Sequence, residues 1–225
     1  INESGADFTV SGDHIRFGLV AVKGVGRGFI NDVLTERQKG AFASFPDFCQ
    51  RMFDSDLNKR VLESLIKCGA FDSMGVFRSQ LLEAYESLVD SIAQNKRKNL
   101  EGQFDLFGGG GDEPQSAPQL NLKNIPEFSR RELMTMEKET TGLYLSGHPM
   151  DEYRDVVKKR KVASIGAILS DFAQEGGPTT FRDEQRVTIA GVVSASRTRT
   201  TRNNTLMAYV TLEDDTGSME LLVFS

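Results

Sequence analysis

The sequence predicts a multidomain α+β protein in which a mostly α-helical part is joined by a flexible linker to a β-rich part. Apolar residues recur at helical spacing from Phe29 to Leu34 and again from Val61 to Ile66. Periodicity disappears between Gln94 and Glu127, where four consecutive glycines followed by Pro and Ser residues are typical of a flexible linker. After residue 185, alternating apolar residues predict the strands of a small sheet or partial barrel.

Composition narrows the class of protein. With 225 residues, 39% of them hydrophobic and 26% charged, the chain is long enough for two small cores and a linker. The net charge of −5 gives no global basic surface, so any contact with nucleic acid has to come from local patches or backbone geometry. No apolar run reaches the length of a membrane span, and the first residues lack the pattern of a secretory signal. Cys49 and Cys68 have no CxxC partner, which indicates reduced thiols that fill the core of a cytoplasmic protein.

The helical part is expected to open on a β-hairpin, because residues 7–19 alternate apolar and other side chains. A tight turn at residues 23–26 then leads into a helix from Phe29 to Arg37, with Gly40 as its stop signal. A short helix over Asp47–Met52 follows.

Capping residues place the later helices. Asn58 is a good N-cap for a helix over Lys59–Cys68, and Gly69 suits the left-handed position after it. Ser129 and Glu132 form an S-x-x-E capping box. Further helices are expected over residues 77–93, 130–139 and 151–159.

The strongest candidate site is the turn made by Lys23, Gly24, Val25, Gly26 and Arg27. Two glycines before a helix let backbone N–H groups approach an anionic oxygen without a Cβ in the way. The two cations would add a salt-sensitive, sequence-independent attraction to DNA phosphates. The alternative is that this GxG merely makes a tight connection between a strand and a helix.

A second helix-turn-helix unit spans Val61–Leu82, with its turn at Cys68–Gly75. Together the two units resemble a tandem helix-hairpin-helix domain, which implies binding to duplex DNA. The second turn lacks the GxG spacing and carries Asp72, so we expect it to be chiefly structural.

Inside the linker stands one short apolar island, Gln103-Phe104-Asp105-Leu106-Phe107. An amide followed by an apolar Leu-Phe pair suits docking into a preformed groove on a partner protein. The pentapeptide resembles the bacterial sliding-clamp-binding motif, which implies polar contacts for Gln103 and an apolar pocket for Leu106 and Phe107. Phe104 stands where that motif usually has leucine. The alternative is an island that folds back on its own domain.

The β-rich tail resembles the start of an OB-fold, with strands expected over Val187–Ser194, Leu206–Leu212 and Ser218–Phe224. A basic loop is expected between the first two strands, where oligonucleotides usually meet this fold. The alternative is a merely solvated loop, because only Tyr209 on the second strand offers an aromatic ring for stacking. The basic residues are Arg186, Arg197, Arg199 and Arg202.

No catalytic or metal-binding residue is expected in this chain. His14 and His148 are the only histidines, and neither lies at metal-ligand spacing from a cysteine. No Ser/His/Asp, Walker or paired-carboxylate motif is present. The carboxylates of Glu213–Asp215 lie in a turn pattern ending at Gly217, which favours a solvated turn over a metal site.

Several longer segments, read together, closely resemble the bacterial DNA polymerase III alpha subunits of the C family of polymerases. The segments are Ile15–Leu19, Val22–Gly26, Leu57–Val61, Gly69–Asp72, Gly142–Pro149 and Met207–Asp214. The resemblance covers essentially the whole chain and keeps the order of hairpin domain, clamp motif and OB-fold. Within Gly142–Pro149, Gly147 and Pro149 look like chain-shaping residues, and His148 is expected to be packed or capping.

By this resemblance the parent protein is a DNA-directed DNA polymerase whose palm carboxylates bind Mg²⁺ upstream of the matched region. This chain would then hold no cofactor. The implied partners are duplex DNA for the helix-hairpin-helix domain, single-stranded DNA for the OB-fold, the sliding clamp and other replicase subunits, in the replisome of the bacterial cytoplasm. A noncatalytic repair adaptor or scaffold built from the same modules is the alternative. A DNA ligase-like enzyme ranks last, because no K-x-D-G motif is present.

The chain is expected to divide into five regions. They are the end of the fingers region at 1–20, the tandem helix-hairpin-helix domain at 21–94, the linker with the clamp motif at 95–128, a helical connector at 129–184 and the first part of the OB-fold at 185–225.

Overall fold

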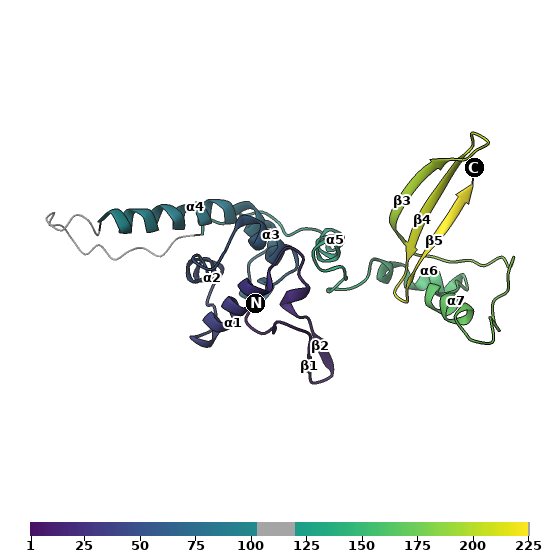
Figure 1. Cartoon of the computed structure of the whole chain (residues 1–225), viewed down its shortest axis with the longest axis horizontal. Coiled ribbons are helices and arrows are strands. Elements are labelled where there is room, and N and C mark those ends of the chain that lie inside the picture. Colours follow the sequence, from purple (N-terminus) through teal and green to yellow (C-terminus); the bar gives the residue numbers. More distant parts are fainter. Residues whose placement is uncertain (103–119, 225) are drawn as a thin grey trace. The chain divides into compact units, whose positions relative to one another are not determined.

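The computed structural model describes residues 1–102 and 120–224, which form two compact units divided between residues 146 and 147 (Figure 1). Both helices and antiparallel sheets are present, so the predicted α+β class is confirmed. Within the described ranges, no helix is long and apolar enough to cross a membrane.

In the first unit a short antiparallel hairpin precedes the helices, as predicted. The hairpin pairs β1 (Thr9–Ser11) with β2 (His14–Arg16). The helices described in this unit are α1 (Arg27–Gln38), α2 (Phe45–Arg51), α3 (Lys59–Lys67), α4 (Arg78–Gly102) and α5 (Arg130–Thr141).

An aromatic cluster lies in the core of the first unit. The ring of Phe48 meets those of Phe42 and Phe71 edge to face, at centroid distances of 4.9 and 5.0 Å. Phe45 contacts Phe71 in the same way, and all four side chains are at most 2% exposed. Burying a large apolar side chain stabilises the folded state by about 1.5–3 kcal/mol. The cluster therefore stabilises the core against which the helices of this unit pack.

Side-chain caps set where α3 and α5 begin. Asn58 Oδ1 accepts a hydrogen bond from the N–H of Val61 at 3.0 Å. Ser129 Oγ accepts from the N–H of Glu132 at 3.3 Å, while the Glu132 carboxylate accepts from the N–H of Ser129 at 2.8 Å. Gly69, after α3, adopts the predicted left-handed conformation with φ of 79°. The predicted N-cap, capping box and glycine stop are all confirmed.

Helix α4 is longer than predicted, since it runs to Gly102 rather than ending near Ala93. On this added length, Lys96 pairs with Asp54 and lies over the ring of Phe53, 4.8 Å from its centroid. These contacts support the helix where its sequence carries no apolar stripe, so a search for apolar periodicity ends the helix too early.

The end of the predicted linker, residues 120–128, is in contact with the helical core. Leu120 packs against the core, and the Glu127 carboxylate accepts hydrogen bonds from the N–H groups of Arg78 at 2.7 Å and Ser79 at 3.0 Å. Glu127 thereby caps the N-terminus of α4 from a distant part of the chain. Such a cap leaves no local sequence pattern.

The second unit combines short helices with a three-stranded sheet in the order β3-β4-β5. A 3-10 helix over Pro149–Tyr153 leads into its first α-helix. The described elements are then α6 (Arg154–Lys159), α7 (Ile165–Phe172), β3 (Val192–Thr200), β4 (Leu206–Glu213) and β5 (Ser218–Phe224).

The predicted start of the first strand of this sheet is wrong, because β3 begins at Val192 rather than Val187. The carbonyl of Thr188 accepts a hydrogen bond from the N–H of Ala163. The residues just before the strand are therefore paired with the helical connector and not with β4. At Gly191 the chain passes so close to β4 that an added Cβ would lie 2.6 Å from the carbonyl oxygen of Glu213. Pairing with β4 therefore starts later than the apolar alternation suggests.

Candidate DNA interface

The turn predicted to bind phosphate precedes α1. Gly24 adopts a φ of 82°, and Val25 is only 7% exposed. Lys23, Gly24, Gly26 and Arg27 are exposed. Val25 therefore anchors the turn in the core, and its N–H donates to the carbonyl of Val22 at 3.3 Å, so neither its side chain nor its N–H is left for a phosphate.

The glycines of the turn differ in what the fold requires of them. An added Cβ at Gly24 would lie 3.3 Å from Ser64 Oγ, and its positive φ favours glycine. Gly26 and Gly28 have ordinary backbone angles, and an added Cβ at either meets nothing within 4 Å. The fold itself thus does not require glycine at these two positions, and both leave open space over the helix start.

The N-terminus of α1 presents backbone donors beside these glycines. Its first helical hydrogen bond runs from the N–H of Ile30 to the carbonyl of Gly26 at 3.1 Å. The N–H groups of Arg27, Gly28 and Phe29 lie before it, and the N-cap residue Gly26 has no side chain to satisfy them. A helix start of this kind favours an anion, by about 0.3–1 kcal/mol.

The two predicted cations of the turn both have partners within the protein. Lys23 Nζ donates to the carbonyl of Glu139 at 3.0 Å, and Arg27 pairs with Asp7 at 2.9 Å. Both contacts are exposed: that of Lys23 is a hydrogen bond to a main-chain carbonyl, and that of Arg27 is an exposed ion pair, which contributes at most about 1 kcal/mol. A phosphate can therefore compete for either cation at little cost.

Sequence reasoning missed a third cation, Arg60. Its Nε lies 3.8 Å from the place where a Cβ of Gly24 would be, and the residue is exposed. Arg60 lies in the first turn of α3, and α3 packs beside the turn that precedes α1. Only the Asn58 cap pattern could have located this helix start, and nothing local joins it to Gly24.

The second turn is closed by the protein's own side chains, in line with its expected structural role. An added Cβ at Gly69 would collide with the guanidinium of Arg78. Arg78 binds the Asp72 carboxylate with Nε at 2.9 Å and Nη2 at 2.6 Å. Burial alone would lower the pKa of Arg78, but the carboxylates of Asp72 and Glu137 outweigh it and raise this pKa above its ordinary value. An external phosphate has no comparable opening here.

In the second unit, the predicted basic loop is largely a strand. Arg197 and Arg199 lie on β3, and of the predicted single-strand-binding residues only Arg202 lies in the turn before β4. The guanidinium carbons of Arg197 and Arg199 lie 4.4 and 6.0 Å from the ring centroid of Tyr209. Met207 on β4 pairs with Arg199 on β3 and with Phe224 on β5, so Phe224 lies on the same face of the sheet as Arg199. The loop prediction is corrected to a strand face that carries both cations and aromatic rings.

Comparison with known proteins identifies the family. A model of the helix-hairpin-helix motif matches residues 1–81. DNA polymerase III subunit alpha of Saccharopolyspora erythraea is 39% identical over all of this chain, and that of Thermus aquaticus is 36% identical over all of it. The subunit of Vibrio cholerae is 36% identical over 94% of the chain. This chain belongs to the DNA polymerase III alpha subunit family. It spans 19%, 17% and 17% of the lengths of these three relatives, so it corresponds to a segment of each.

The remaining predictions for this alpha-subunit segment concern the clamp motif, the cysteines and His148. The predicted clamp motif, Gln103, Phe104, Asp105, Leu106 and Phe107, lies outside the described residues. Burial raises the pKa of Cys49 to about 12 and that of Cys68 to about 11, so both thiols are protonated. Cys49 lies in the core as predicted, and Cys68 is partly buried against it. His148 Nδ1 accepts from the N–H of Met150 at 3.1 Å, which confirms the capping role.

The acidic turn of the same segment caps a helix. Asp214 is 9% exposed and accepts hydrogen bonds from the N–H groups of Ile165, Thr216 and Gly217. Burial would raise its pKa, but these donors outweigh burial and lower it. The turn prediction is confirmed, although the carboxylate is buried rather than solvated. Among the residues that the structure describes, no group of three or more His, Cys, Asp or Glu side chains is placed to hold a metal ion.

Proposed function

We propose that this chain is the DNA-binding and clamp-tethering segment of a DNA polymerase III alpha subunit that carries out template-directed DNA synthesis. In this proposal the turn from Lys23 to Gly28 grips the backbone of duplex DNA. The observation that carries it is the open space at Gly26 and Gly28, beside backbone donors that the helix does not satisfy. Membership of the alpha-subunit family supports the same function.

Sequence-independent binding suits this geometry. Backbone N–H groups and exposed cations contact phosphate and carry no base information. The whole chain has a net charge of −5, so the attraction has to be local to Lys23, Arg27 and Arg60. A single helix end contributes little, and several such contacts along one chain raise the overall affinity together.

The proposal is tested by the salt dependence of duplex binding. Replacing Arg27 and Arg60 by Gln should lower the slope of log K against log salt by about 0.9 for each phosphate that is no longer neutralised. The matched control replaces Lys96 and Lys123 by Gln, because these cations also form exposed ion pairs, with Asp54 and Glu83. If the arginine variant keeps the affinity and slope of the wild type, Arg27 and Arg60 neutralise no phosphate, and the electrostatic part of the proposal fails.

We also propose that residues 103–107 bind the sliding clamp. Replacing Gln103, Leu106 and Phe107 by Ala and measuring affinity for purified clamp tests this directly. Unchanged affinity would remove the tether. In this proposal, residues outside this segment bind the Mg²⁺ ions of the polymerase reaction. The protein acts in the replisome of the bacterial cytoplasm, together with other replicase subunits.

For the second unit we propose binding of single-stranded DNA on the β3-β4-β5 face. Arg197 and Arg199 around Tyr209 support it, because bases stack on aromatic rings and guanidinium planes while cations contact the backbone. Replacing Tyr209 by Leu should weaken binding to an oligothymidine by about 1–3 kcal/mol and leave duplex binding unchanged. Equal binding of the oligothymidine by both proteins would reject this surface.

A further inference from the structure

A buried carboxylate on α5 joins parts of the first unit that are distant in sequence. Glu137 is 0% exposed. Its Oε2 accepts from the N–H groups of Leu145 and Ser146, both at 2.9 Å, and from Ser146 Oγ at 3.1 Å. Its Oε1 accepts from Arg78 Nη2 at 3.0 Å. One side chain thus binds both the segment after α5 and the start of α4.

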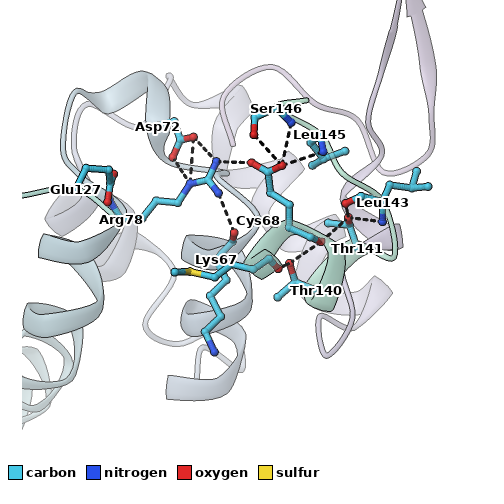
Figure 2. Close-up of polar contacts among 12 residues, drawn as sticks. Lys67, Cys68, Asp72, Arg78, Glu127, Thr140, Thr141, Leu143, Leu145 and Ser146 are labelled. Carbon is cyan, nitrogen blue, oxygen red and sulfur yellow. Dashed lines mark hydrogen bonds and ion pairs between the residues drawn. The ribbon is translucent and has the colours of Figure 1, made fainter. Parts of the chain in front are cut away.

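Through Arg78, the contact extends to the second hairpin turn. Figure 2 shows Arg78 in contact with Asp72 and the main chain of Lys67 on one side, and on the other with the carboxylate that Leu145 and Ser146 also contact. Arg78 Nη1 donates to the carbonyl of Lys67 at 3.1 Å, at the last residue of α3. The guanidinium therefore fixes the end of α3, the turn and the start of α4 as one unit.

The same end of α5 holds the first hairpin turn. The N–H of Lys23 donates to the carbonyl of Thr140 at 2.7 Å, and Lys23 Nζ donates to the carbonyl of Glu139. Gly142 then reverses the chain with a φ of 81°, which brings Leu145 and Ser146 back toward Glu137. We call residues 137–146 the α5 clasp.

We infer that the α5 clasp sets the position of the phosphate-binding turn against the rest of the hairpin domain, and that Glu137 is its positioning residue. The inference rests on the proposed DNA binding. Glu137 itself is buried and touches no ligand, so its effect on DNA passes through Thr140 and Lys23. This assigns a role to the first half of the Gly142–Pro149 segment, whose chemistry the sequence left open.

Directional contacts favour positioning over mere stability. A buried ion pair is often no more stabilising than apolar residues of the same volume, whereas several hydrogen bonds to one carboxylate allow only one arrangement of their donors. Here the donors belong to α4 and to the segment after α5, while the next turn of the same helix holds Lys23.

The test compares Glu137→Gln with a core variant, Leu88→Ala, which removes buried apolar volume from α4 without touching the clasp. Duplex affinity is measured at a temperature at which circular dichroism shows both variants folded. Amide hydrogen exchange is followed at Lys23, Leu145 and Ser146. We expect Glu137→Gln to speed exchange at all three amides, to weaken duplex binding about two- to fivefold and to lower its salt slope. Leu88→Ala should leave duplex affinity and salt slope unchanged, and should speed exchange at these three amides no more than at other protected amides of the first unit.

Each outcome separates the inference from the proposed function. If the wild type fails to bind duplex DNA, the proposed function fails, and the inference falls with it. If the wild type binds and Glu137→Gln binds equally well, or leaves the exchange of Lys23 unchanged, only the positioning role is overturned. Should Glu137→Gln not fold, Ser146→Ala removes one contact to the same carboxylate, and it should shift Lys23 exchange and affinity in the same direction. No shift in either would equally overturn the role.

Discussion

Replacing Gly28 by Ala should raise stability and weaken DNA binding at once. Gly28 lies in the first turn of α1, and an added Cβ meets nothing within 4 Å, so the methyl group brings no clash. Alanine is favoured over glycine in a helix by about 0.5–1 kcal/mol, which corresponds to a rise in Tm of roughly 2–4 °C. The same methyl group would stand where a phosphate approaches the helix start. We expect duplex affinity to fall about two- to fivefold, the size of one helix-end interaction.

Thermal unfolding and fluorescence anisotropy with a labelled duplex measure the two effects. Gly24→Ala is the first control: its φ of 82° costs about 1–2 kcal/mol with a side chain, so stability and binding should both fall. Gly176→Ala is the second, because its Cβ would also meet open space but in the other unit, and binding should not change. A Gly28→Ala protein that is more stable and binds duplex as tightly as the wild type would refute the reasoning.

Three further predictions concern buried groups of the two units. Glu137→Ala removes a carboxylate from buried Arg78 and should lower the unfolding free energy of the first unit by about 3–5 kcal/mol in urea; a loss below about 1 kcal/mol would contradict the buried pair. Hydrogen bonds from backbone N–H groups, of which that of Phe181 has the largest effect, hold the pKa of Asp171 at about 2, against an ordinary value of 3.8. Because this pKa is depressed by folding, the stability it contributes is complete above pH 3.8 and is lost as the pH falls toward 2. Asp171→Asn should therefore flatten the acid side of the stability curve of the second unit, and an unchanged slope would argue against it. Since burial raises the pKa of Cys49 to about 12, iodoacetamide at pH 8 should leave it unmodified until urea unfolds the protein, as mass spectrometry would show.

The sequence predicts those elements whose signals are local. The Asn58 cap, the Ser129–Glu132 capping box and the glycine after α3 each need only a few neighbouring residues, and all three are confirmed. The shift of β3 could not be predicted in this way. A strand is defined by its partner, and the partner of Arg197 is Tyr209, beyond a turn.

The candidate site was predictable in part for the same reason. Two glycines before a helix are a local pattern, so the turn itself is found from the sequence. Arg60 and the Glu139 carbonyl reach the turn only because α3 and α5 pack beside it. Glu137 was missed entirely, since a lone glutamate within a polar helix has the sequence pattern of a solvated residue. Its 0% exposure and its hydrogen bonds from Arg78, Leu145 and Ser146 are features of the folded chain, without a local sequence pattern.

The asymmetry of the two hairpin turns is the strongest physical reason to assign DNA binding to the first. Both contain a glycine with positive φ, at Gly24 and at Gly69, but the N–H groups of Gly69 and Ala70 already donate to the carbonyls of Ile66 and Leu65. At Gly69 the guanidinium of Arg78 already fills the space and is itself neutralised by Asp72. The first turn instead leaves the positions beyond Gly24 open and surrounds them with cations held only by exposed contacts. At the first turn an external phosphate can supply the negative charge that Asp72 supplies at the second. Substitutions that fill the first turn should therefore weaken binding, whereas the second turn leaves no comparable space for a phosphate.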